Sequence, residues 1–433
     1  MTATAWVAVV VFVAVYVLIA TERVHRVAAA IGGAAVMLLI GATDAEHAFF
    51  SEEAGVDWNV VFLLLGMMLI VAVLQRTGFF EYLAIWAAKR ARGRPFRVMV
   101  ILVVVTALAS AVLDNVTTVL LIAPVTFLVC ERLAVPVAPF LIAEALSSNI
   151  GGTATLVGDP PNIIIASRAG LSYNDFLVHL APLVLVLMVV FIGLCRWLFR
   201  SAFTYDENRT EALMALRERD VIRDRRLLAI SLAVLTVVTA AFALHSVLHL
   251  EPSVVALTGG LLLLALSGLD AESVARDVEW PTLIFFAGLF VMVGALVNTG
   301  VIDNVATAAA DATEGRLLLA SLGLLWVSAA LSAIVDNIPY VATMSPVVAE
   351  LVHTAGNSSQ SKALWWSLAL GADLGGNATA VGASANVVIL GLAERSGRHI
   401  SFWEFTKYGL IVAIATVGLA TPYLWLRYFV LAS

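Results

Sequence analysis

Two Asp-Asn pairs each separate two long apolar runs of the sequence. Asp114-Asn115 stands between apolar residues 98–113 and 116–130, and Asp336-Asn337 stands between 317–335 and 338–352. If these runs lie in a membrane, each carboxylate costs about 2.5–3.5 kcal/mol even on insertion scales, so a cation, a proton or a hydrogen-bond donor must compensate for it. The alternative is that each aspartate only caps the following helix. Because the pair occurs twice at matching positions, we favour an ion site, with these four residues as candidate sodium ligands.

Two further segments interrupt apolar stretches with glycine, threonine and asparagine. They read SSNIGGTATLVGDPPNII at 147–164 and GADLGGNATAVGASANVVI at 371–389. We expect each to be a broken helix whose paired glycines allow positive φ and close approach of a ligand to the backbone. Asp159 is expected to cap one second half-helix and Ser384 the other, and both helix starts direct partial positive charge into the break. Besides the Asp-Asn pairs, the candidate substrate- and ion-binding residues are Thr117, Thr118, Asn149, Gly151, Gly152, Thr153, Thr155, Asp159, Asn162, Asp373, Gly375, Gly376, Asn377, Thr379, Ser384 and Asn386.

The two breaks differ in charge. Asn149 aligns with Asp373, and Asp159 aligns with Ala383, so the two half-sites are chemically unequal. Glu144 lies one turn before the first break and has no acidic counterpart in the second. It is a candidate proton carrier, and a carboxyl that is merely hydrogen-bonded within the bundle is an equal alternative.

These residues are embedded in a chain whose composition does not suit a water-exposed surface. Of its 433 residues, 61% are hydrophobic and 13% charged, and the mean hydropathy is +0.98, whereas soluble domains carry about 25% charged residues. The composition excludes a soluble enzyme, and a net charge of −6 gives no case for nucleic acid as a partner. No histidine falls within a predicted span, so a membrane-embedded hydrolase is not expected either. We predict an all-α, multi-pass protein of the plasma membrane that is not an enzyme.

The chain consists of two similar halves. The Asp-Asn pairs are 222 residues apart, and the Gly-Gly pairs at 151–152 and 375–376 are 224 residues apart. We predict a first repeat over 1–200, a charged cytoplasmic linker over 201–226 and a second repeat over 227–433. The loop over 76–97 is rich in Lys and Arg, whereas the matching loop over 298–316 has only Arg316, so the positive-inside rule places the two loops on opposite sides. The result is two inverted repeats, each with about five crossings, one re-entrant hairpin and one broken helix, which is typical of secondary transporters.

Four motifs carry a resemblance to a known family. LDNVTTVLLIAPVT, SNIGGTATLVGDPPNIII, VDNIPYVATMSPV and LGGNATAVGASANVV closely resemble the ArsB/NhaD group of the ion transporter superfamily. Within this group they are most similar to the melanosomal P protein and to bacterial permeases described as arsenic- or citrate-transporting. The resemblance implies a scaffold domain and a mobile transport domain, a homodimer, and an elevator-like movement.

The sequence therefore predicts a secondary active transporter of a small inorganic or organic ion. Arsenite or anion efflux is the leading hypothesis, because the two Asp-Asn pairs and the two interrupted segments at 147–164 and 371–389 contain four aspartates but no Lys or Arg to attract citrate. Sodium/proton antiport and sodium-coupled carboxylate transport are the alternatives, and a channel built on the same fold also stays open. No cofactor is expected beyond sodium or a proton as the coupling ion.

Overall fold

Helices make up the regular structure of this protein. The computed structural model describes residues 2–21, 23–51, 54–203, 218–313, 315–356 and 358–431, and contains no strand in these ranges, as the all-α prediction requires. Among the described residues, six helices are long and apolar enough to cross a membrane, and a seventh span results if the bent pair Val301–Ala312 (α18) and Leu317–Ser332 (α19) is one span. The chain is thus a multi-pass membrane protein, as predicted.

Every apolar stretch predicted from the sequence contains a helix. In the first half the main helices are α1 (Ala3–Ala20), α2 (Arg26–Leu39), α4 (Trp58–Gln75), α6 (Pro95–Ser110), α7 (Asn115–Leu133), α8 (Ala138–Gly152), α9 (Pro160–Ala169) and α11 (Ala181–Leu198). In the second half they are α13 (Arg225–Ala243), α15 (Pro252–Ser267), α17 (Trp280–Asn298), α19, α20 (Asn337–Thr354), α21 (Ser359–Gly375), α22 (Ser384–Arg395) and α23 (Phe402–Trp425). Four short helices join them, namely α3 (Ala45–Phe50), α10 (Tyr173–His179), α14 (His245–Leu248) and α16 (Ala271–Ala275).

The two segments predicted as loops before the Asp-Asn pairs are largely helical. They form α5 (Phe79–Arg90) and α18, so that part of the prediction was wrong. Each helix follows a glycine in the left-handed conformation, with φ of 79° at Gly78 and 70° at Gly300. The recurrence of Thr-Gly at both positions therefore marks the same sharp helix start in each half. Each helix has 12 residues, which is too short to cross a membrane alone.

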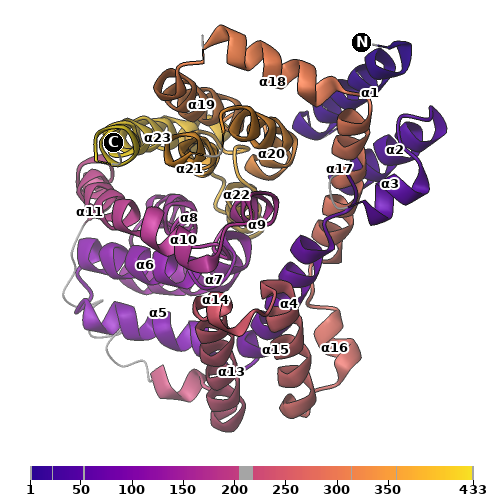
Figure 1. Ribbon diagram of the computed structural model, residues 1–433. Coiled ribbons are helices and arrows are strands. Elements are labelled where there is room, and N and C mark those ends of the chain that lie inside the picture. Colours follow the sequence, from indigo (N-terminus) through magenta and orange to yellow (C-terminus); the bar gives the residue numbers. More distant parts are fainter. Residues whose placement is uncertain are drawn as a thin grey trace.

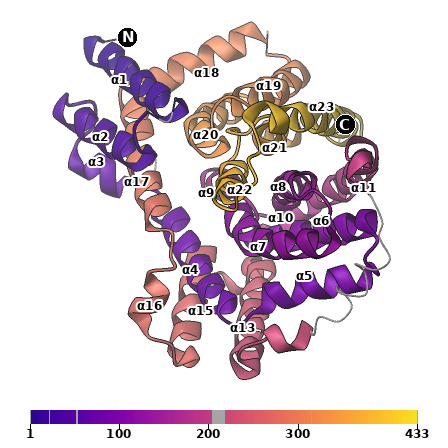
Figure 2. The same cartoon turned by 180° about the vertical axis from the view of Figure 1, so that it is seen from behind.

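Two groups of helices are visible in Figures 1 and 2. The flanking layer contains α1–α4, α13 and α15–α17, and the central bundle contains α6–α11 and α19–α23. In the flanking layer α2 packs against α17 and α15 packs against α4, so each pair combines both halves of the chain. In the bundle α6 packs against α8, and α19 packs against α21. Figure 1 shows α5 and α18 along the outside of the bundle.

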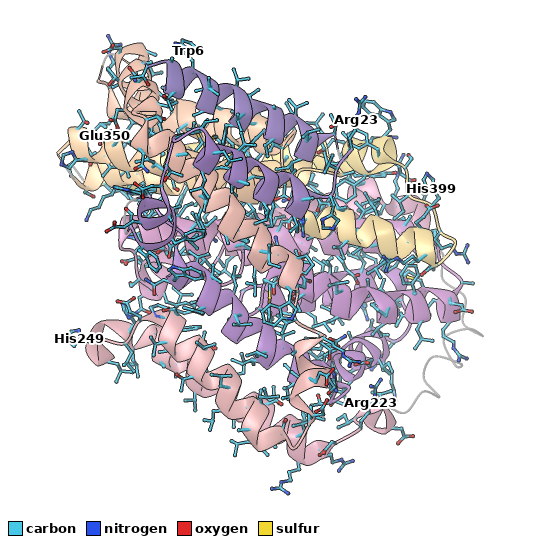
Figure 3. The ribbon with its side chains drawn as sticks, turned by 90° about the vertical axis from the view of Figure 1, so that its right-hand side faces the viewer. Trp6, Arg23, Arg223, His249, Glu350 and His399 are labelled. Atoms are coloured by element: carbon cyan, nitrogen blue, oxygen red, sulfur yellow. The ribbon has the colours of Figure 1, made fainter. Side chains whose placement is uncertain are left out.

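The labelled side chains of Figure 3 lie toward two ends of the molecule. Figure 3 places Arg23, Arg223 and His399 toward one end, and His249 and Glu350 toward the opposite end. Arg23 and Arg223 therefore share an end, and the cytoplasmic location of the linker stays a prediction. Of the predicted linker over 201–226, residues 204–217 lie outside the described part of the chain.

Candidate functional site

Each Asp-Asn pair lies at the turn between two packed helices. The backbone N–H of Thr117 donates to Asp114 at 2.8 Å, and the Thr117 hydroxyl also donates to it. The backbone N–H of Ile338 donates to Asp336 at 3.0 Å. Both aspartates therefore cap the helices α7 and α20, as the alternative interpretation held. Capping occupies part of each carboxylate and leaves lone pairs for a further partner.

The breaks in the helices are shorter than expected. The first covers 153–159 between α8 and α9, and the second covers 379–383, after a 3₁₀ turn at Gly376–Ala378 and before α22. Thr155 donates to the carbonyl of Ala111, and Thr379 donates to that of Ala333, both at 2.6 Å. The same contact thus holds each break against the end of the preceding hairpin helix in both halves.

The paired glycines do not adopt the positive φ that glycine allows. Gly151 and Gly375 lie within the last turns of α8 and α21 and have ordinary helical backbone. A Cβ at either position would lie 2.4 Å from the backbone of Ala107 or Ala329. The glycines are needed because the helices approach each other closely, not because the chain turns there.

Of the two predicted caps, the position of Asp159 is confirmed and that of Ser384 was wrong. Asp159 holds the N-cap position of α9, but its side chain makes no capping hydrogen bond. The N-cap of α22 is Ala383, so Ser384 is already in the helix. Each side chain bonds elsewhere: Asp159 accepts from Asn115 at 2.9 Å, and the Ser384 hydroxyl donates to Asp336.

A network of buried amides joins the two halves. Asn149 receives a hydrogen bond from Asn115 at 3.1 Å. It then donates to the side-chain oxygens of Asn377 at 3.0 Å and Asn386 at 3.1 Å. Asn337 donates to both oxygens of Asp159, at 3.3 and 3.4 Å. The structure therefore brings both hairpin tips and both breaks into one connected polar cluster.

Several polar atoms in this region have no hydrogen-bond partner among the described residues. They are Asn115 Oδ1, Thr118 Oγ1, Asn162 Oδ1, Asn377 Nδ2 and both carboxylate oxygens of Asp373. Such atoms are expensive to bury unless a ligand, ion or proton satisfies them. No group of three or more His, Cys, Asp or Glu side chains in the described ranges is arranged to hold a metal. Of the four predicted sodium ligands, Asn115 fits that role best, because its amide oxygen is free.

Glu144 lies one turn from this cluster on α8. Its side chain is buried and accepts a hydrogen bond from the hydroxyl of Thr126. One carboxyl oxygen of Glu144 has no partner in the described residues. The predicted hydrogen bond within the bundle is therefore present, and the role of proton carrier stays a prediction.

The sequence analysis missed a contribution from the flanking layer. Arg26, at the start of α2, donates to Ser384 at 3.0 Å and to Thr282 at 3.3 Å. Thr282 in turn donates to Glu279 at 3.2 Å. A narrow cavity is lined by Arg26 and Glu279 together with Asp114 of the first tip. The statement that the four motifs contain no Lys or Arg is true of the sequence, but the fold adds Arg26 to the site.

A larger cavity lies beside the second tip. It has a volume of about 360 Å³ and is lined by His25, Arg26, Asp336, Ser384 and apolar side chains. Arg26 was missed because it belongs to a short polar segment before an apolar run, far in sequence from every motif. Its position at the first turn of a membrane helix is the signal that could have found it.

The sequence of this chain matches a known family of membrane transporters. The profile of the citrate transporter family matches residues 16–371. The chain belongs to the citrate transporter family. An uncharacterized transporter of Mycobacterium tuberculosis is 57% identical to it over 98% of this chain and 99% of its own length. The 46 kDa membrane protein of Mycobacterium leprae is 55% identical over the same shares of the two chains, 98% and 99%.

A more distant relative is the human P protein. It is 35% identical over 94% of this citrate transporter family member and 58% of its own length. The resemblance to the ArsB/NhaD group is thereby confirmed. Among solved structures, the YdaH transporter of Alcanivorax borkumensis has the same fold, with a TM-score of 0.58, 16% identity and 84% of each chain covered. The chain is a membrane transporter.

Proposed function

We propose that this protein is a secondary active transporter that exports a small hydroxylated solute across the plasma membrane, with arsenite as the leading substrate. The observation that carries the proposal is the charge around the hairpin tips. Asp114, Asp336 and Asp373 lie close enough to Asp159 to act on it electrostatically, and the basic side chain that contacts this region is Arg26. A multivalent anion such as citrate would therefore meet an excess of carboxyl groups.

A neutral substrate avoids this repulsion. Undissociated arsenous acid carries no charge, and its hydroxyls can both donate and accept hydrogen bonds. Asn115 Oδ1 and Asn377 Nδ2, which have no partner in the described residues, offer one acceptor and one donor. A buried amide left without a partner costs about 1–3 kcal/mol. Binding such a solute would therefore also provide the hydrogen-bond partners that these amides lack.

The division of the molecule supports an elevator-like mechanism. The hairpin tips and both breaks belong to the central bundle, whereas Arg26, Thr282 and Glu279 belong to the flanking layer. In the proposal the layer is a fixed scaffold and the bundle moves with its bound substrate. The proposal includes re-entrant hairpins, inverted repeats and a homodimer whose contacts are made by the scaffold. A carrier of this kind works by conformational steps on the microsecond-to-second timescale, unlike a channel.

Sodium-coupled carboxylate transport is the second candidate, and Arg26 favours it. A guanidinium is well suited to bind a carboxylate through two parallel hydrogen bonds. The description of the matching family also names citrate. Bound sodium ions or protons would then have to neutralise the aspartates first. Sodium/proton antiport, which would use the same carboxyls without an anion, stays a prediction from the sequence.

Expression in a bacterial host that lacks its own arsenite efflux tests the proposal. The protein should raise arsenite tolerance, and replacing Asn377 by Ala should cancel the gain. Asn304 on the outer helix α18 is exposed, so Asn304→Ala is the matched control and should keep the tolerance. The purified protein should also move arsenite in proteoliposomes in which sodium and pH gradients are varied separately. Saturable, sodium-driven citrate uptake without an arsenite phenotype would favour the second candidate instead.

A further inference from the structure

Asn149 and Asp373 occupy equivalent positions in the two halves. Each lies near the end of the helix before a break, and they are 224 residues apart. Asn149 Nδ2 donates across the molecule to Asn377 and Asn386, at 3.0 and 3.1 Å. The residues equivalent to these two acceptors are Thr153 and Asn162, and they are the polar side chains that face Asp373. The two halves therefore repeat one cross-contact, with Asn as the central residue in one copy and Asp in the other.

The hydrogen-bond donors of Asn162 and Thr153 already bind main-chain carbonyls. Asn162 Nδ2 donates to the carbonyls of Gly152 at 3.4 Å and Thr155 at 3.0 Å, which leaves Asn162 Oδ1 as the free end of the amide. Asn386 makes the matching pair of bonds in the second half, so the orientation of this amide is the same in both copies. The hydroxyl of Thr153 donates to the carbonyl of Asn149 at 2.8 Å.

The donors of the two polar side chains nearest Asp373 are thus bonded to main-chain carbonyls. The side chain of Asp373 is completely buried, and neither carboxylate oxygen has a hydrogen-bond partner in the described residues. An ionised carboxylate in such a place would be far more costly than a neutral acid. A carboxylic acid has nearly the shape of a carboxamide and provides a hydrogen atom where Asn149 provides its N–H.

The other carboxyl groups near the site are held differently. Asp159, on which Asp373 acts electrostatically, accepts from the amides of Asn115 and Asn337. Asp114 accepts from Thr117, and Asp336 accepts from Ser384. Glu144, on the neighbouring helix α8, accepts from the Thr126 hydroxyl. Asp373 therefore stands apart from the other buried carboxyls described here, because it receives no hydrogen bond.

We propose that Asp373 carries the proton that is coupled to transport. The side chain is neutral in the arrangement described here and donates its O–H to Asn162 Oδ1. When the bundle moves and the site opens to water, the proton leaves and the carboxylate becomes solvated. The proposal deepens the proposed secondary transport, since it names the coupling ion and the group that binds it.

Infrared difference spectroscopy of the full-length protein in liposomes tests the proposal without any substrate. The wild type should show the carbonyl band of a protonated carboxylic acid that shifts in D₂O, and Asp373→Asn should lose it. Asp311 on α18 is exposed, so Asp311→Asn is the control and should keep the band. Asn162→Ala should keep the band but move it to higher frequency, because the acid loses its acceptor.

Three results would overturn the proposal. The first is that the carbonyl band survives in Asp373→Asn. The second is that Asn162→Ala leaves the frequency of the band unchanged. The third is that wild-type protein in choline chloride lacks the band, and that added sodium chloride perturbs the protein only when Asp373 is present, which would identify sodium as the occupant. Because the spectrum requires no transported solute, loss of the arsenite phenotype alone would contradict the proposed function and leave this result intact.

Discussion

The guanidinium of Arg26 donates to the Ser384 hydroxyl at 3.0 Å, and that hydroxyl donates to the carboxylate of Asp336. Arg26 belongs to α2 of the flanking layer, Ser384 begins the half-helix α22, and Asp336 forms the second hairpin tip. One chain of hydrogen bonds therefore connects the two groups of helices through both kinds of motif. Any relative movement of the bundle and the layer must break it.

Replacement of Arg26 by Gln should lower the initial transport rate in proteoliposomes by about tenfold. A hydrogen bond to a charged group contributes about 1.5–3 kcal/mol, and its loss leaves Asp336 without its basic neighbour. Arg23 is exposed and three residues away, so Arg23→Gln is the matched control. Equal rates for the two variants would show that Arg26 only holds the structure together.

Asp114→Asn and Asp336→Asn should abolish ion-coupled transport and leave folding intact. Asparagine caps a helix about as well as aspartate, so the bonds from the backbone at 117 and 338 have an acceptor in both variants. The measurement is the dependence of transport on sodium and pH gradients, with thermal unfolding in detergent as the check on folding. Unchanged ion dependence in both variants would reduce the two aspartates to caps.

Gly151→Ala and Gly375→Ala should each lower the free energy of unfolding by about 1–3 kcal/mol, the usual range for overpacking. The added Cβ would lie 2.4 Å from backbone atoms of the neighbouring hairpin helix, which cannot yield as a side chain can. Gly193 on α11 has open space at the same position, so Gly193→Ala should be neutral or stabilising. Thermal unfolding in one detergent compares the three. Equal stability of all three would show that the helices can separate without cost.

Much of the fold could be predicted from the sequence, because lipid imposes simple rules. Apolar length gives the spans, and the repeated Asp-Asn and Gly-Gly pairs locate the hairpins and breaks. The helices α5 and α18 were missed because their composition is mixed, so hydropathy does not separate them from loops. The geometry at Gly151 was misjudged because its small size serves a contact with Ala107, which is distant in sequence.

The candidate site was predictable only where it repeats. Asn149 and Asn386 were chosen from their motifs, and the structure joins them. Arg26 has no repeated partner in the motifs, and its role depends on the packing of α2 beside α17. A contact of this kind depends on tertiary packing, so local sequence patterns do not predict it.

The predicted topology is open to a direct labelling test. Arg92 and Asp311 are exposed and lie just after α5 and within α18, the two equivalent outer helices. A single cysteine at Arg92 should react with a membrane-impermeant reagent only from the cytoplasm, and one at Asp311 only from outside. The native thiols of Cys130 and Cys195 are buried and should give little background. Labelling of both sites from one face would contradict the inverted repeat.

Moving the carboxyl group from position 373 to the equivalent position 149 in the first half is the sharpest test of the asymmetry between the halves. Asp373→Asn should make transport insensitive to an imposed pH gradient, because the amide donates to Asn162 Oδ1 permanently. Adding Asn149→Asp should restore sensitivity, since an acid there faces the side-chain oxygens of Asn377 and Asn386 and again needs a proton. Its carbonyl can still accept from Asn115, as Asn149 does at 3.1 Å. The measurement is the transport rate in proteoliposomes at several pH gradients for the single and double variants. A double variant that stays as insensitive as Asp373→Asn would show that the two positions are not interchangeable, and the proton would then have to be carried elsewhere, with Glu144 as the next residue to replace.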